Sequence, residues 1–178
     1  QLAAHPNTTG DFVQIKTINA NGRQLKSTGN FIISLDGIMW KTLKPFPSTL
    51  VITKEAMIQT GANGQKSVMS GADNQMFQSI ADTLSSVFAG DDTQLAKHFK
   101  TELSTAGKNW TITLTPKDST IAAVMQSLIL SGNENNSEFF LDSLELNETS
   151  SNKICYEFQK QKYPKELTED EKANFTTK

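Results

Sequence analysis

The sequence predicts a mainly β protein of the α+β class, built as a curled antiparallel sheet that forms an unclosed half barrel. Three observations lead to this prediction. About ten short segments alternate apolar and polar side chains between Gly, Pro, Asn and Asp turns. One amphipathic helical stretch interrupts them, and a sheet of about ten strands has to curl. We expect a helical lid over the apolar concave face, a shape that can hold an apolar ligand.

Length and charge limit the classes of protein to consider. The chain has 178 residues, so we expect a single domain over 1–178, with a polar C-terminal extension at 162–178. The net charge is −2 and Arg23 is the only arginine, which argues against nucleic-acid binding. No run of about 18 apolar residues is present to span a membrane. The chain starts at Gln1 and shows no signal peptide, so we expect a mature or trimmed product.

The first two strands are predicted over Asp11–Ala20 and Gln24–Leu35. Asn21 and Gly22 between them both tolerate a positive φ, which is typical of a tight hairpin turn. Gly29 interrupts the second strand and indicates a bend or a bulge.

The stretch Gly29–Thr53 organises the sheet as an antiparallel meander that carries Trp40. Asp36 and Gly37 form a strong hairpin signal because both tolerate a positive φ. Two prolines mark the next corner, after which Leu50–Ile52 begins a further strand. Two short strands are predicted to follow, over Glu55–Thr60 and Gln65–Ser70.

The hydrophobic period then changes from two to about 3.6 residues. Within Asp73–Ala89, apolar residues recur at spacings of three and four, which predicts an amphipathic helix. Asp73 or Asn74 can cap its start, and Gly90 lies where a helix is expected to end. A second, short helix is predicted over Thr93–Phe99.

The C-terminal half returns to strands. Four of them are predicted, over Phe99–Ser104, Asn109–Thr115, Ser137–Asn147 and Asn152–Gln161. The segment Ser119–Ser131 fits either a helical turn that leads into a strand or one long strand. The tail, Lys162–Lys178, is expected to be a solvated extension with a helical turn at Leu167–Ala173. Cys155 is alone in the chain, so we expect a small residue on the last strand rather than a disulfide.

The sequence holds no recognisable catalytic constellation. It contains no Gly-rich phosphate loop with Lys-Ser/Thr, no G-x-S-x-G and no H-E-x-x-H. Only His5 and His98 are available, too few for a typical metal cluster or a positioned base for Cys155. Acidic pairs such as Asp91 and Asp92 lie in polar segments, where we expect them to be solvated. We therefore predict a protein that is not an enzyme, with no catalytic residue and no metal site.

A series of short motifs runs along the chain in a defined order. They are FVQIK at Phe12–Lys16, STGNF at Ser27–Phe31, DGIMWKT-x-x-PF at Asp36–Phe46, LVIT at Leu50–Thr53, WTITLTPK at Trp110–Lys117 and LILSG at Leu128–Gly132. Each motif is weak alone, but their order and spacing resemble the LolA-like family of periplasmic outer-membrane lipoprotein carriers. The likeness extends from Gly10 to Gln161.

This resemblance implies an unclosed half barrel capped by helices around an apolar cavity. It also implies transport without covalent chemistry and without a cofactor. Family carriers accept acylated lipoproteins from an inner-membrane ATP-dependent release complex and deliver them to an outer-membrane receptor. We therefore expect a periplasmic protein of a Gram-negative bacterium, with an acylated lipoprotein or another lipid as cargo. We expect a monomer, because carriers must cross the periplasm freely.

The sequence departs from the best-known carriers at one point. Those proteins have an arginine a few residues before the tryptophan of this meander, and it helps to hold the lid closed. Here the segment Ile32–Met39 contains no basic residue, and Arg23 lies far away in a hairpin. The arginine switch therefore does not transfer to this chain. A divergent member that carries a glycolipid, or a lipid-like pigment for an inner-membrane exporter, stays open.

The predicted ligand-binding residues are apolar and come from the strands and the lid. On the concave face they are Phe12, Phe31, Ile33, Trp40, Leu50, Ile52, Trp110 and Ile112. On the lid they are Met76, Phe77, Ile80 and Leu84. The alternative is that these residues form a closed core, and a single bulge would exchange the inner and outer sides of a strand.

Two other classes of protein also stay open. An enzyme built on the half barrel would need two converging carboxylates of raised pKa, and the sequence offers no such pair. A binding module could hold a protein segment on the concave sheet without any lipid. The material that copurifies with the protein distinguishes these classes.

Overall fold

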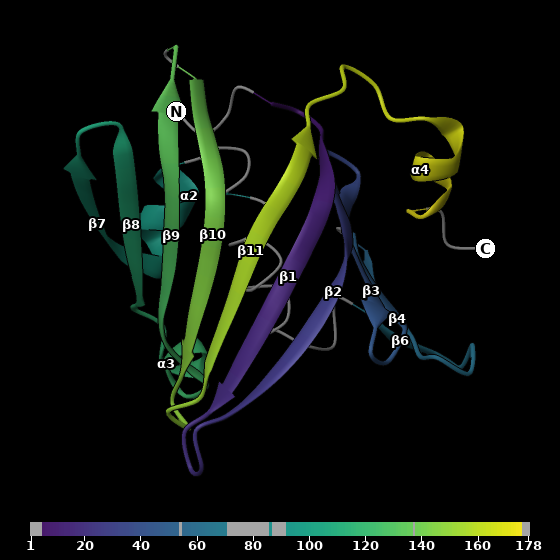
Figure 1. Ribbon diagram of the computed structural model, residues 1–178, viewed down its shortest axis with the longest axis horizontal. Coiled ribbons are helices and arrows are strands. Elements are labelled where there is room, and N and C mark those ends of the chain that lie inside the picture. The colour runs from purple at the N-terminus through teal and green to yellow at the C-terminus, as the bar shows by residue number, and fades with distance from the viewer. Residues whose placement is uncertain (1–4, 54, 71–85, 87–91, 137, 176–178) are drawn as a thin grey trace.

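The computed structural model describes residues 5–53, 55–70, 86, 92–136 and 138–175. Its centre is an 11-stranded antiparallel sheet with the order β6-β5-β4-β3-β2-β1-β11-β10-β9-β8-β7 (Figure 1). In this part of the chain the outer strands, β6 and β7, do not pair with each other, so the sheet stays open. The predicted fold class, a mainly β protein with an unclosed antiparallel half barrel, is confirmed.

The N-terminal half supplies six strands that follow the predicted ranges closely. They are β1 (Thr8–Ile18), β2 (Arg23–Ser34), β3 (Gly37–Lys44), β4 (Ser48–Ile52), β5 (Ala56–Thr60) and β6 (Lys66–Ser70). Gly22 has a φ of 66°, as the hairpin signal predicted. The register between β2 and β3 shifts at Gly29, as expected for a bulge, but the extra residue is Leu43 on β3 and not a residue of β2.

The turn between β2 and β3 lies one residue earlier than predicted. Ser34 pairs with Gly37, so the two turn residues are Leu35 and Asp36, and Gly37 already belongs to β3. The Ser34 hydroxyl accepts a hydrogen bond from the Asp36 backbone N–H at 3.1 Å, which fixes the turn there. Gly37 is required for another reason, because a Cβ at this position would overlap the backbone oxygen of Ile52.

The C-terminal half supplies five strands and three short helices. They are α2 (Asp92–His98), β7 (Phe99–Ala106), β8 (Asn109–Pro116), α3 (Ser119–Ala122), β9 (Met125–Asn135), β10 (Glu138–Glu148), β11 (Lys153–Lys162) and α4 (Glu169–Ala173). The ambiguous segment 119–131 is therefore a helical turn that leads into a strand. The predicted helix over 73–89 lies outside the described residues except for Ser86, which is helical.

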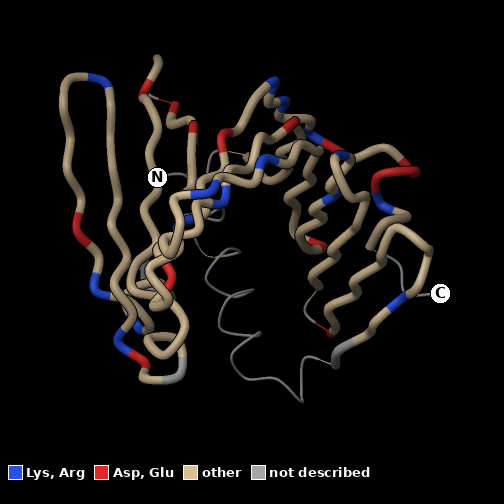
Figure 2. Tube along the Cα trace, turned by 60° about the horizontal axis from the view of Figure 1, so that its bottom comes forward, with Lys and Arg blue, Asp and Glu red and all other residues tan. Residues whose placement is uncertain are grey.

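The sheet consists of two meanders, which are joined where the first strand pairs with the eleventh. β1 to β6 form one meander, β7 to β11 form the other, and β1 pairs with β11 in the middle of the sheet. The sheet arches, so that the β7–β8 arm and the β3–β6 arm stand on opposite sides in Figure 2. The same view shows charges of both signs interspersed over the described residues, mainly near turns and in the tail, without a large field of one sign.

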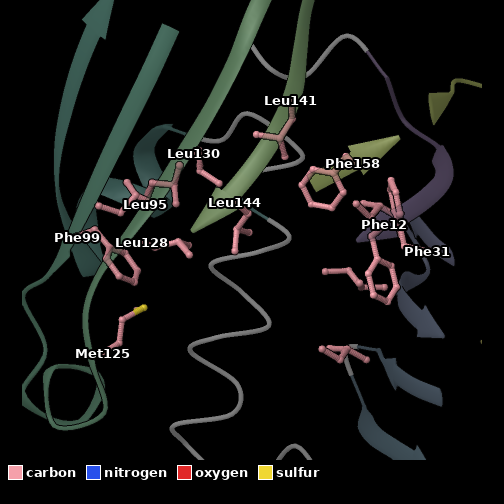
Figure 3. Close-up of a cluster of buried hydrophobic side chains, with 14 of the residues drawn as sticks. Phe12, Phe31, Leu95, Phe99, Met125, Leu128, Leu130, Leu141, Leu144 and Phe158 are labelled. Carbon is pink, nitrogen blue, oxygen red and sulfur yellow. The ribbon is translucent and has the colours of Figure 1, made fainter. Parts of the chain in front are cut away.

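The main core covers the concave face of the arch (Figure 3). It draws large apolar side chains from both meanders and from α2 and α3. Its buried members are Phe12, Phe31, Ile33, Ile38, Ile52, Leu95, Phe99, Trp110, Leu114, Ile121, Met125, Leu128, Leu130, Leu141, Leu144 and Phe158.

A second, smaller cluster lies on the convex face and includes the tail. Leu167 is only 5% exposed and packs with Ile32, Met39 and Val51. The side-chain amide of Asn7 fastens the start of the tail by donating to the carbonyl oxygens of Pro164 and Lys165, at 3.2 and 3.0 Å. The expected helical turn is present as α4. The expectation that the tail is simply solvated was wrong, because its apolar anchors are docked on the sheet.

Candidate functional site

The candidate site is the apolar concave face, and the strand register decides which residues belong to it. Residues that pair across antiparallel strands project from the same face. Phe31 pairs with Trp40, and Trp40 pairs with Leu50. In the same way Ile33 pairs with Ile38, which pairs with Ile52. The arm from β2 to β4 therefore presents one continuous apolar strip to the concave side.

Five aromatic rings gather in the middle of this face. Trp40 has its ring centroid 5.2 Å from that of Phe12, 5.7 Å from that of Phe31 and 4.9 Å from that of Tyr156. Phe158 lies 5.1 Å from Phe31. Burial raises the pKa of Tyr156 to about 12, since the ionised phenol would be poorly solvated there. These rings join β3 to β11 through the centre of the sheet.

The other arm continues the apolar surface on β8 and β9. Trp110 pairs with Gly132, and Ile112 pairs with Leu130. The indole of Trp110 lies against Gly132 so closely that a Cβ there would overlap the ring. Trp110 is 4% exposed, whereas Ile112 is half-buried.

All eight strand residues predicted for the site lie in or against the one concave cluster. Five are buried members of it: Phe12, Phe31, Ile33, Ile52 and Trp110. Three are partly buried and pack against it: Trp40, Leu50 and Ile112. The four predicted lid residues, Met76, Phe77, Ile80 and Leu84, lie outside the described residues. The shared face of the eight strand residues is consistent with a binding surface, and the role of all twelve residues in ligand binding stays a prediction.

Several residues of this face were missed by the sequence analysis. Tyr156 and Phe158 alternate with Glu157 and Gln159 on β11, a period-2 signal that could have identified them. Leu141 and Leu144 both reach the concave cluster although they are three residues apart. A register shift between Leu141 and Ser143 changes the alternation of β10, which sequence pattern alone does not reveal.

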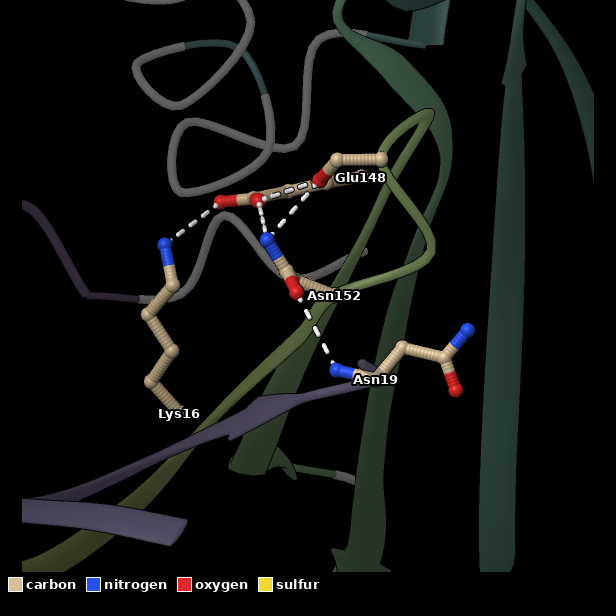
Figure 4. Close-up of polar contacts among 5 residues, drawn as sticks. Lys16, Asn19, Glu148 and Asn152 are labelled. Atoms are coloured by element: carbon tan, nitrogen blue, oxygen red, sulfur yellow. Dashed lines mark hydrogen bonds and ion pairs between the residues drawn. The ribbon is translucent and has the colours of Figure 1, made fainter. Parts of the chain in front are cut away.

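A polar network lies where the β1–β2 hairpin approaches the β10–β11 turn (Figure 4). Lys16 Nζ donates to Glu148 Oε1 at 3.1 Å, and Asn152 Nδ2 donates to Glu148 Oε2 at 3.0 Å. Asn152 Oδ1 accepts from the Asn19 backbone N–H at 3.2 Å. Burial by itself raises the pKa of Glu148, but hydrogen bonds from Asn152, Lys16 and Ser150 outweigh it and hold that pKa below its ordinary value. The network ties the β1–β2 hairpin to the β10–β11 turn.

The described residues do not bring metal-ligating side chains together. No group of three or more His, Cys, Asp and Glu side chains within them could hold a metal ion. Cys155 is half-buried on β11, as expected, and burial raises the pKa of its thiol. No helix among the described residues is long and apolar enough to cross a membrane.

A separate cavity of about 410 Å³ lies between the sheet and α4. Its lining includes Phe31, Ile32, Met39, Lys160 and Glu171. Lys160 Nζ is already paired with the carboxylate of Asp11 at 2.8 Å. Of the eight strand residues predicted for the ligand site, Phe31 alone also lines this cavity.

The fold and this face define an open antiparallel half barrel with an apolar inner wall. The chain belongs to the LolA family, because the family model described as outer membrane lipoprotein carrier protein LolA matches residues 6–175. The resemblance inferred from the motifs is thereby confirmed. No curated protein matches the sequence.

Two solved structures resemble this chain at low sequence identity. A DUF1329 family protein from Desulfovibrio piger is 9% identical, with a TM-score of 0.55 over 99% of this chain and 92% of its own. A candidate outer membrane lipoprotein-sorting protein domain from Vibrio parahaemolyticus is 8% identical, with a TM-score of 0.46 over 95% of this chain and 91% of its own. The first of these likenesses supports the fold alone.

Family membership supports a general role as a periplasmic carrier of lipoproteins or lipids. The family consists of carriers rather than enzymes, in agreement with the prediction that the chain is not an enzyme.

Proposed function

We propose that this protein shields the acyl chains of a lipoprotein, or of a related lipid, against its concave face and carries them from the inner towards the outer membrane. An inner-membrane release complex or exporter would supply the cargo, and an outer-membrane receptor would accept it. The protein would act as a monomer and without a cofactor.

The observation that carries this proposal is the large apolar cluster on the concave face of an open sheet. The concave face collects rings and branched chains from both arms, and Trp40, Leu50 and Ile112 remain partly exposed there. A closed core would bury such residues fully, whereas a binding surface leaves them accessible to a ligand. The second arm, β7–β8, adds Leu103, which is 66% exposed and pairs with Ile112.

The size of the apolar effect suits a carrier. An acyl chain that buries about ten methylenes gains roughly 8 kcal/mol, at about 0.8 kcal/mol for each. This corresponds to an affinity near micromolar before the cost of ordering the chain. A carrier needs affinity of that order because it must also release its cargo.

The cargo can be a lipoprotein or a lipid without a protein part. Within 32–39 there is no basic side chain, and Arg23, at the start of β2, is exposed at the far hairpin. The arginine switch of the best-known carriers therefore has no counterpart on the β2–β3 turn. This difference favours testing a glycolipid or another exporter-delivered lipid alongside a lipoprotein.

The experiment compares two isoleucines that lie on opposite faces of the same part of the sheet. Ile112 and Ile129 are both half-buried and belong to neighbouring strands, β8 and β9. Ile112 pairs with Leu130 and belongs to the concave face, whereas Ile129 pairs with Thr113 and projects from the convex face. Ile112→Ser should weaken binding of a fluorescent acyl probe by about tenfold. Ile129→Ser should leave the affinity within about twofold of the wild type.

Native mass spectrometry and lipid extraction of the freshly purified protein complete the test. A bound species with acyl chains supports the carrier role, and its head group identifies the cargo class. A protein that neither carries lipid nor takes up the probe would contradict the carrier role. Copurification of a polypeptide in its place would favour the protein-binding module.

A further inference from the structure

We infer that the indole N–H groups of Trp40 and Trp110 donate hydrogen bonds to carbonyl oxygens of the cargo. The concave face would then select ester- or amide-linked acyl chains over bare hydrocarbon chains. This inference rests on the proposed carrier function and specifies the chemical group that the site recognises.

Trp110 provides the stronger observation. Its side chain is 96% buried, and its Nε1 atom is shielded from solvent without an acceptor among the described residues. The ring lies against Gly132 on β9, where the sheet offers no side chain as a partner. Its same-face neighbours on β8 are Ile112 and Leu114, which also offer no acceptor.

Trp40 repeats the pattern on the other arm. Its Nε1 atom is also buried and without an acceptor among the residues the structure describes. The ring is surrounded by Phe12, Phe31, Tyr156 and Phe158, so its neighbourhood is aromatic. Unlike Trp110, the residue is only partly buried, so part of its ring, though not Nε1 itself, is exposed.

The chemistry explains why a tryptophan should stand at both positions. Folded proteins rarely leave a buried N–H without an acceptor, because the group has lost its hydrogen bonds to water. The indole N–H is a donor only, so its partner must be an acceptor such as a carbonyl oxygen. A surface that recognised hydrocarbon alone would be served by phenylalanine without this cost. An acyl ester or amide supplies a carbonyl at the head of the apolar chain.

The test uses two lipids that differ only in the carbonyl group. Dimyristoylglycerol carries two ester carbonyls, and di-O-tetradecylglycerol replaces them with methylenes while keeping the chains. Dissociation constants are measured by displacement of a fluorescent alkyl probe from the wild type and from Trp40→Phe, Trp110→Phe and the double variant. The wild type should bind the diester several-fold more tightly than the diether. Each Phe variant should lose part of this ratio and keep its affinity for the diether.

A second readout follows the two N–H groups directly. The chain has two tryptophans, so ¹⁵N-labelled protein should give two indole cross peaks in an NMR correlation spectrum. Both should move downfield with the diester and much less with the diether. A well-dispersed spectrum of each variant establishes that it is folded.

The outcomes separate this inference from the proposed function. Equal affinity for the two lipids in the wild type would overturn the inference and leave the carrier role intact. Equal weakening of both lipids in the Phe variants would also overturn it, because ring contact alone would explain the loss. Failure of the folded wild type to bind either lipid would count against the carrier role itself.

Discussion

Phe12 on β1 lies directly across from Gly29 on β2, and its ring fills the space where a side chain on Gly29 would stand. A Cβ at Gly29 would come within 2.7 Å of Phe12 Cζ and would overlap the backbone oxygen of Lys41. The backbone on the other side belongs to β3, so the new atom has no space on either side. Glycine is therefore required here by close approach, at the point where β3 carries its extra residue, Leu43.

Gly29→Ala should destabilise the protein by about 2 kcal/mol or more, since overpacking displaces both a core ring and a strand. Urea denaturation measures the change. Gly61→Ala is the matched control, because the nearest atom to its new Cβ is the Asn63 side-chain oxygen at 3.3 Å, in an exposed turn. The control should stay within about 0.5 kcal/mol of the wild type. A Gly29→Ala protein as stable as the control would contradict the close approach.

Leu167→Ala should release the tail from the convex face. Leu167 is 5% exposed against Ile32, Met39 and Val51, so its loss should weaken tail docking by about 2 kcal/mol. Trypsin should then cleave after Lys165 or Lys172 faster than in the wild type. Leu35→Ala makes the same change at a leucine that is 78% exposed, and its cleavage rate should match the wild type. Equal cleavage of the two variants would show that Leu167 does not hold the tail.

The two tyrosines should resist ionisation in the folded protein. Burial raises the pKa of Tyr156 to about 12, and burial together with Asp142 and Glu138 raises that of Tyr163 to about 12. Absorbance at the tyrosinate wavelength should therefore stay low near pH 10.5, where an unfolded tyrosine is more than half ionised. Because both pKa values rise on folding, this contribution to stability is complete below about pH 10 and is lost as the pH approaches 12. The control is the same tyrosine titration of the protein unfolded in urea. If the folded protein titrated at the same pH as the unfolded one, the burial of the tyrosines would be contradicted.

The Lys16–Glu148 network should make stability depend on pH in the acid range. The pKa of Glu148 is lowered on folding, so its contribution is present above the unfolded value of about 4.3 and is lost as the pH falls through the folded value. Between about pH 6 and pH 3 the wild type should therefore lose more stability than Glu148→Gln. Glu102→Gln is the control, because its pair with Lys100 at 2.8 Å is exposed and screened by solvent. The control should follow the wild type over the whole range.

Local pattern was sufficient to predict the strands and the concave face. Alternating side chains identified most strands to within about three residues, because one side of each strand faces the core and the turns carry Gly, Pro or Asn; β9 stayed ambiguous within 119–131. The same alternation placed Phe31, Trp40 and Leu50 on one face, and the cross-strand register agrees.

Features set by contacts distant in sequence could not be predicted. The docking of Leu167 depends on the convex face of β2 to β4, whose side chains are far from it along the chain. Gly37 was assigned to the turn because Asp-Gly is a strong hairpin signal, yet its role is to let β3 approach the carbonyl of Ile52. The local hydrogen bond from the Asp36 N–H to Ser34 moved the turn by one residue.

The pairing of β1 with β11 also determines the order in which the sheet can be completed. Lys160 donates to Asp11 across 149 residues of sequence, whereas the other strand pairs join neighbours along the chain. Closing so long a loop is entropically costly and slows folding. Because the chain is synthesised from its N-terminus, β1 to β6 can assemble early. The free side of β1 then stays an unpaired edge until β11 is available. Such an edge can pair with another chain, so the nascent protein is most prone to aggregation just before β11 is available.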